Sequence, residues 1–137
     1  MRDKLLAALN EYAILTKTNP VGYTRDVLSC VAGVFHRENS AVICHIEAYH
    51  DYINLDVLHE ILNLKDDKIL SADLFVGKLT NEKSLKQVTD ILDSKNIPYE
   101  ISDVFRDLSN QTSIIYDYNT DKYSMIDYGH DMEIVMR

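Results

Sequence analysis

Two apolar, strand-like runs separated by a short polar turn constrain the fold of this chain more than any other feature. The runs cover residues 29–36 and 41–47, and the residues between them, 37–40, read Arg-Glu-Asn-Ser. Runs of this length with a polar connection predict a β-hairpin. In an antiparallel pair, the start of one strand lies beside the end of the other. The hairpin would therefore bring Cys30 close to His45.

The spacing of apolar residues predicts the remaining elements. Helices are expected at 3–16, 54–64 and 81–94, and further strands at 70–76, 99–105, 113–118, 123–128 and 133–136. Strands outnumber helices, and the hairpins are local. We therefore expect an α+β fold with mixed, largely antiparallel sheets flanked by helices.

The chain reads as one domain. It has 137 residues, enough to bury a core of its own, and no repeat, low-complexity tract or Pro/Gly/Ser-rich linker divides it. We expect a single domain over 1–137, in which an amphipathic helix at about 3–16 precedes the main body.

Charge and hydropathy exclude several classes of partner. The chain has 14 Lys and Arg residues against 22 Asp and Glu residues, a net charge of −8. Because an acidic domain is not attracted to phosphate backbones, we expect no binding of nucleic acid. No apolar run approaches the roughly 18 residues of a membrane-spanning helix, so we expect no membrane insertion. Residues 1–17 also lack the continuous apolar stretch of a signal peptide.

The two cysteines differ in their surroundings. Cys44 lies between Ile43 and Ile46 and is expected to be a small buried hydrophobic residue. Cys30 has more chemistry open to it, because a thiol with a pKa of about 8.5 becomes a better nucleophile when an imidazole takes its proton. The spacing alone leaves two interpretations: a nucleophile activated by His45, or a buried cysteine with an unrelated histidine.

The stretch 45–51 also contains side chains that can ligate metals. His45 and Glu47 would share a strand face, and His50 or Asp51 could reach them from the following loop. The spacing matches none of the usual zinc patterns. Solvated loop residues are the simpler interpretation, and we expect no metal.

The segment Leu28-Ser29-Cys30-Val31, followed by His45, resembles the bacterial chemoreceptor glutamine deamidases, and the likeness extends to toxin deamidases of the cytotoxic-necrotizing-factor type. Segments 72–77, 81–98 and 113–126 resemble further elements of that family, so the likeness covers residues 20–127. The chain lacks several of the family's glycines, at residues 28, 41–42 and 106–112. Since glycines let a backbone approach a substrate closely, these replacements indicate a divergent member with a different pocket.

This resemblance implies a deamidase-like, sandwich-like fold and an enzyme that converts a glutamine of a target protein into glutamate. Cys30 would be the nucleophile and His45 the general acid and base, while Thr24 would orient the imidazole. The backbone N–H groups of Ser29 and Cys30 would stabilise the oxyanion. No cofactor is required, and capture of the thioester by an amine would give a transglutaminase side activity.

The resemblance also leads to expectations about the biological role and the location of the protein. The replaced glycines favour a toxin or effector over a chemotaxis enzyme. We expect a location in the bacterial cytoplasm, or delivery into a target cell as an effector without a classical signal peptide. The alternative is a catalytically inactive protein-interaction domain on the same scaffold, in which Cys30 and His45 only pack.

Overall fold

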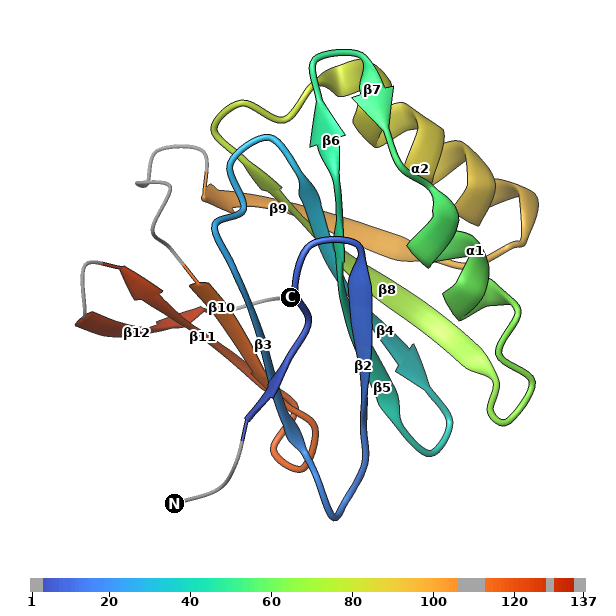
Figure 1. The fold of residues 1–137 in the computed structure, drawn as a ribbon. Coiled ribbons are helices and arrows are strands. Elements are labelled where there is room, and N and C mark those ends of the chain that lie inside the picture. Colours follow the sequence, from blue (N-terminus) through green and yellow to red (C-terminus); the bar gives the residue numbers. More distant parts are fainter. Residues whose placement is uncertain (1–3, 106–112, 128–129, 135–137) are drawn as a thin grey trace.

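Two five-stranded sheets packed face to face form the body of the molecule (Figure 1). The structure is a computed structural model and describes residues 4–105, 113–127 and 130–134. The first sheet contains, in spatial order, β1 (Leu5–Leu6), β3 (Val21–Arg25), β10 (Ser113–Asp117), β11 (Lys122–Asp127) and β12 (His130–Ile134). The second contains β2 (Glu11–Leu15), β5 (Ala41–Ile46), β4 (Val31–Arg37), β8 (Ile69–Gly77) and β9 (Tyr99–Phe105).

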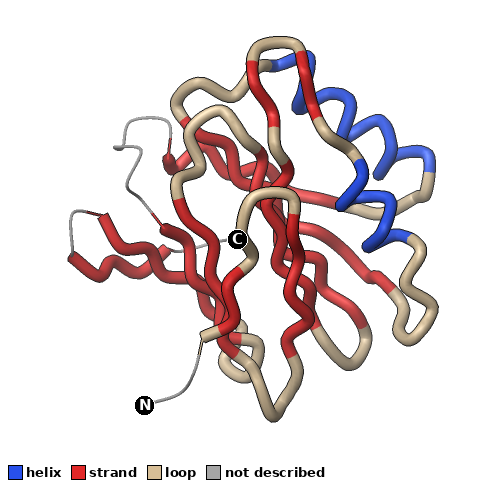
Figure 2. Tube along the Cα trace, in the orientation of Figure 1, coloured by secondary structure: helices blue, strands red, loops and turns tan. Residues whose placement is uncertain are grey.

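A short hairpin and two helices complete the described fold. β6 (Ala48–Tyr49) pairs with β7 (Tyr52–Ile53), and α1 (Asp56–Leu62) and α2 (Glu82–Ser94) lie over the outer face of the second sheet (Figure 2). Within the sheets, β1–β3 and β8–β9 pair in parallel and the other pairs are antiparallel. The predicted α+β class, with mixed, largely antiparallel sheets in a sandwich flanked by helices, is confirmed. Among the residues that the structure describes, no helix is both long and apolar enough to cross a membrane.

The second sheet lies between two apolar cores, which is why β5 is buried on both faces. One core fills the space between the sheets and includes Ala32, Ile43 and Tyr116. The other lies between the second sheet and the helices and includes Val42 and Cys44. Neighbouring residues of a strand point to opposite faces, so alternate residues of β5 enter different cores. Cys44 has no exposed surface, and its expected role as a small core residue is confirmed.

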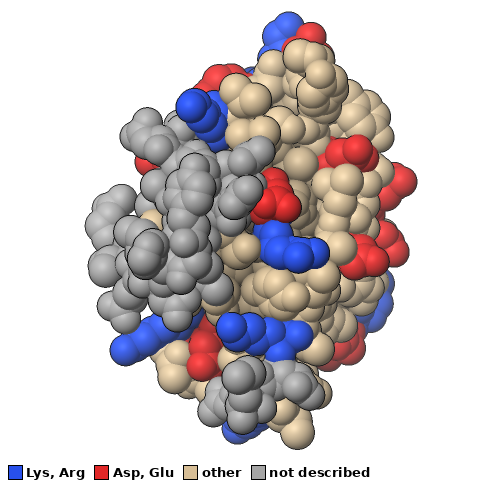
Figure 3. All heavy atoms as spheres, turned by 60° about the vertical axis from the view of Figure 1, so that its left-hand side comes forward, with Lys and Arg blue, Asp and Glu red and all other residues tan. Residues whose placement is uncertain are grey.

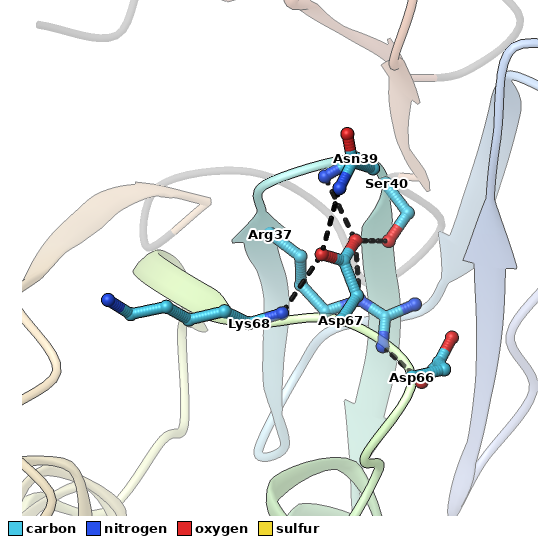
Figure 4. A network of polar contacts seen from close by, with 6 residues as sticks. All are labelled: Arg37, Asn39, Ser40, Asp66, Asp67 and Lys68. Atoms are coloured by element: carbon cyan, nitrogen blue, oxygen red, sulfur yellow. Dashed lines mark hydrogen bonds and ion pairs between the residues drawn. The ribbon is translucent and has the colours of Figure 1, made fainter.

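The turn between β4 and β5 is held by Asp67, which lies in the loop before β8 (Figure 4). Its carboxylate accepts hydrogen bonds from Ser40 Oγ at 2.7 Å and from the Asn39 N–H at 2.9 Å. The hydrogen bond from Ser40 is the main cause of the lowered pKa of Asp67. The hairpin held in this way has the register that places Ala32 directly opposite His45.

The prediction of an N-terminal helix at 3–16 is wrong. The segment forms two strands, β1 and β2, joined by a turn in which Asn10 has a φ of 60°. An α-helix does not accommodate this left-handed conformation. The Asn10 N–H donates to the His45 carbonyl oxygen at 2.8 Å, and β2 then pairs with β5. The edge of β5 offers backbone groups that need partners, and this pairing overrides the helical spacing of the apolar residues.

The other predicted helices and strands are present, with bounds that differ by up to three residues. The strands expected at 123–128 and 133–136 extend beyond the described residues. β3 is not predicted, because 18–22 contains the turn residues Asn, Pro and Gly and is expected to be a loop. β6 and β7 are also not predicted.

Candidate functional site

The loop that joins β3 to β4 carries Ser29 and Cys30 to the end of the sandwich where β5 ends and β2 begins (Figure 1). His45 lies near the end of β5, directly opposite Ala32 of β4. Cys30 precedes Ala32 by two residues, just before β4 begins, so it occupies the diagonal position to His45 across the hairpin. The start of one strand and the end of the other therefore meet here, as the sequence predicts.

Cys30 and His45 line one cavity of about 300 Å³. The other residues that line it come from the N-terminal segment and the end of β3: Leu6, Ala8, Leu9, Arg25 and Asp26. The segment expected to be a helix thus provides the apolar wall of the cavity, and the end of β3 provides two opposite charges. A cavity of this size is at the lower end of the range for ligand sites and can hold one amino-acid side chain.

Thr24 fixes the protonation pattern of the His45 ring. Thr24 Oγ1 lies 2.7 Å from His45 Nδ1 and donates to the Ala7 carbonyl oxygen, also at 2.7 Å. A hydroxyl has one proton, and here it is committed to Ala7, so the hydroxyl oxygen accepts the proton of Nδ1. Nε2 therefore carries the lone pair, and it is buried with no hydrogen-bond partner. The structure thus brings Thr24 and His45 together, and the catalytic role of this contact stays a prediction.

Burial sets the charge state of the Cys30–His45 pair. Burial raises the pKa of the Cys30 thiol, and this effect exceeds that of hydrogen bonds with the Ala48 backbone and the Ser29 side chain, which lower the pKa. Burial also lowers the pKa of His45, and the Asp26 carboxylate acts against this shift. Both groups are therefore neutral at pH 7. No hydrogen bond joins the thiol to the imidazole; the Cys30 thiol instead points to the Ala48 carbonyl oxygen at 4.0 Å.

Ser29 is tied to the backbone of β6. Its hydroxyl donates to the Ala48 carbonyl oxygen at 2.7 Å, the same oxygen that the Cys30 thiol faces. The Ser29 side chain is thus committed to holding the loop. Its contribution to an oxyanion site would come from its backbone N–H, and that role, like that of the Cys30 N–H, stays a prediction.

The turn after β8 holds the Cys30 loop from the other side. Thr80 Oγ1 donates to the Cys30 carbonyl oxygen at 2.9 Å and accepts the Gly77 N–H at 2.8 Å. The Leu79 N–H donates to the Leu28 carbonyl oxygen at 2.8 Å. A Cβ on Gly77 would lie 2.4 Å from that Leu28 oxygen, so only glycine fits there. Gly77 ends the segment 72–77 that resembles the deamidase family, whereas no motif in the sequence pointed to Thr80.

The residues considered as metal ligands are not gathered into one site. Glu47 Oε1 accepts a hydrogen bond from Asn10 Nδ2 at 2.9 Å, while His50 and Asp51 are exposed in the turn between β6 and β7. Over the described ranges, no group of three or more His, Cys, Asp or Glu side chains is arranged to hold a metal ion.

Comparisons with known proteins leave the family assignment as a prediction. No known family model matches the sequence, and no curated protein matches it. On one face of the molecule, acidic and basic side chains of the described residues lie near one another (Figure 3).

Proposed function

We propose that this protein is a cysteine-dependent amidohydrolase that deamidates a glutamine side chain of a target protein. The observation that carries the proposal is the arrangement around His45. The imidazole lines the same cavity as Cys30, and Thr24 fixes its Nδ1 proton, which leaves Nε2 without a hydrogen-bond partner. A nucleophile, a base and a group that orients the base are the parts that nucleophilic catalysis needs.

The reaction begins with a neutral thiol and a neutral imidazole. His45 Nε2 takes the thiol proton as Sγ bonds to the carboxamide carbon, and the carbonyl oxygen becomes an oxyanion. The C–N bond then breaks, and the imidazolium gives its proton to the departing ammonia. A water molecule attacks the resulting thioester while His45 takes its proton. The C–S bond breaks, the thiol is re-formed, and the glutamine side chain has become a carboxylate.

The electrostatics support a proton transfer that accompanies attack. A resting ion pair would need a lowered thiol pKa, whereas burial raises the pKa of Cys30. A neutral imidazole with a lowered pKa stays free to accept a proton throughout the neutral pH range. Hydrogen bonds between nucleophile and base are often long without substrate and shorten when the site is filled. Substrate binding would therefore bring Sγ and Nε2 together.

The size of the cavity favours a single amino-acid side chain as the group that reacts. Its volume of about 300 Å³ is small, and its apolar wall includes Leu6 and Leu9, which are 36% and 49% exposed. Exposed leucines beside a narrow cavity offer contacts to the protein that carries the glutamine. We propose a cytoplasmic target, either in the producing bacterium or in a cell that receives the protein as an effector.

The test compares glutamine-to-glutamate conversion across a lysate by quantitative mass spectrometry after incubation with three proteins. The wild type should convert a discrete set of glutamines, and Cys30→Ser should convert none of them. Cys44→Ala is the matched control, because Cys44 lies in the core between the second sheet and the helices and does not line the cavity. This variant should retain the wild-type set. If Cys30→Ser converts the same glutamines as the wild type, the proposal is wrong.

A second candidate, an interaction domain without catalysis, is favoured by one observation. The Cys30 thiol has a raised pKa and no hydrogen bond to His45, as a packing residue would. The rate of alkylation distinguishes the two. In an enzyme, Cys30 reacts faster than Cys44, whose pKa burial raises to about 12, and His45→Ala slows Cys30 about tenfold or more. In a packing role, His45→Ala leaves the Cys30 rate unchanged.

A further inference from the structure

Asp26 occupies an unusual backbone position beside the candidate site. It follows the last residue of β3, its side chain is exposed, and it lines the cavity together with Cys30 and His45. Its φ of 58° lies in the left-handed region, which only a few non-glycine residues adopt, Asp and Asn most often. The Leu28 N–H donates to the Asp26 carbonyl oxygen at 3.0 Å, so the conformation is part of the loop that leads to Cys30.

The Asp26 carboxylate can distinguish a carboxamide from a carboxylate by the hydrogen bonds that each can form with it. An ionised Asp can only accept hydrogen bonds. A glutamine carboxamide presents an NH₂ group with two donors, whereas the deamidated product presents only acceptors and a negative charge. Beside the Asp26 carboxylate, the carboxamide can be bound and the carboxylate product is repelled.

The other charges around the cavity do not provide this selection. Glu47 contributes to the raised pKa of Cys30, but its side chain accepts the Asn10 amide rather than lining the cavity. Arg25 does line it and has the opposite charge, which would attract a carboxylate. The charge selectivity of the cavity therefore depends on the opposing effects of Arg25 and Asp26. Asp26 lines the cavity together with both reacting groups, and its carboxylate acts against the lowering of the His45 pKa by burial.

We propose that Asp26 is a specificity-determining residue that makes the cavity accept neutral carboxamides and reject carboxylates. The inference rests on the proposed function, because it assigns the substrate preference of the same site. Its consequence for catalysis is release of product: once the glutamine has become glutamate, its charge is repelled by Asp26, and the site is free for another substrate.

Two alkylating reagents of nearly equal size test this without knowledge of the target. Iodoacetamide carries a carboxamide and iodoacetate a carboxylate. We define the ratio as the rate of iodoacetamide divided by the rate of iodoacetate at Cys30, measured by mass spectrometry. This ratio, divided by the same ratio for 2-mercaptoethanol, reports the charge selectivity of the cavity. Asp26→Asn and Asp26→Gly both remove the carboxylate and suit a positive φ, so both should fold. Asp90→Asn, on the exposed face of α2, is the control with the same change in net charge.

We expect the wild type to prefer iodoacetamide, and both Asp26 variants to lose that preference by about threefold or more. Asp90→Asn should keep the wild-type ratio, and Arg25→Gln should raise it. The inference is overturned if the Asp26 variants keep the wild-type ratio, if Asp90→Asn lowers it equally, or if the wild type prefers iodoacetate. His45→Ala separates this result from the proposed function: rates that do not depend on His45 contradict the catalytic pair, whatever the ratio.

Discussion

Thr24 Oγ1 and His45 Nδ1 lie 2.7 Å apart inside the sandwich, and both residues are buried. The hydroxyl also donates to the Ala7 carbonyl oxygen, so the N-terminal segment, β3 and β5 are connected through one side chain. Because β3 belongs to the first sheet and β5 to the second, the orientation of the imidazole depends on how the two sheets pack. The candidate base is thus positioned by the fold rather than by one loop.

Replacing Thr24 with valine should impair the function of the site while it preserves the shape of the site. Valine keeps the volume but leaves Nδ1 and the Ala7 oxygen without their partner, which costs about 1–3 kcal/mol of unfolding free energy. The imidazole can then place its proton on Nε2, so His45-dependent alkylation of Cys30 should fall by about tenfold. Thr24→Ser, which keeps the hydroxyl, should retain most of the rate. Equal rates in the valine and serine variants would contradict the role given to the hydroxyl.

The lowered pKa of His45 predicts a loss of stability in mild acid. The pKa is near 6.5 in the unfolded chain and lies below that in the folded protein. As the pH falls through 6.5, the unfolded chain binds a proton that the folded protein does not bind. The contribution of His45 to the free energy of unfolding should therefore be constant above pH 6.5. Below pH 6.5 this contribution should decrease until the folded-state pKa is reached.

Urea denaturation at a series of pH values checks this. His45→Asn retains a donor to Thr24 but cannot be protonated, so its stability should decline less steeply between pH 7 and pH 5. The difference in slope should be at most about 1.4 kcal/mol per pH unit, the limit for one proton. Parallel profiles for the two proteins would show that His45 is not the group that titrates.

The β4–β5 hairpin and the placement of Cys30 and His45 at the same end of it can be predicted from the sequence for a local reason. Both strands are continuous apolar runs with a polar turn between them, and a hairpin needs no information from the rest of the chain. Cys44 is predictable in the same way, from its apolar neighbours.

The N-terminal strands and β3 cannot be predicted so simply, because distant residues decide them. Gly22 resembles a loop residue, yet it lies inside β3, where a Cβ would come within 2.8 Å of the side chains of Ile43 and Leu15. Glycine allows the two sheets to approach there. The Ala7 N–H likewise finds its partner in the Tyr23 carbonyl oxygen. The apolar wall of the cavity and the position of Asp26 follow from these long-range contacts.

Gly77→Ala should disturb the Cys30 loop severely. The added Cβ would lie 2.1 Å from the Val27 oxygen and 2.4 Å from the Leu28 oxygen, and these are backbone atoms that cannot rotate away. We expect a loss of about 3 kcal/mol or more in unfolding free energy, or failure to fold. Gly33→Ala is the matched control, because its closest neighbour is a Leu74 side-chain atom at 3.3 Å. Calorimetric unfolding should show a smaller loss for Gly33→Ala; the reverse order would contradict this packing.

Thr80→Val should separate the position of Cys30 from the stability of the fold. The hydroxyl bridges the Gly77 N–H and the Cys30 carbonyl oxygen, both buried, so its loss should cost about 1–3 kcal/mol. Because one of these bonds holds Cys30 itself, the ratio of alkylation rates for wild-type and His45→Ala forms should also shrink in the Thr80→Val background. Thr89→Val, which removes a hydroxyl from α2, should leave that ratio unchanged. A stability loss with an unaltered ratio would show that Thr80 supports the turn without positioning Cys30.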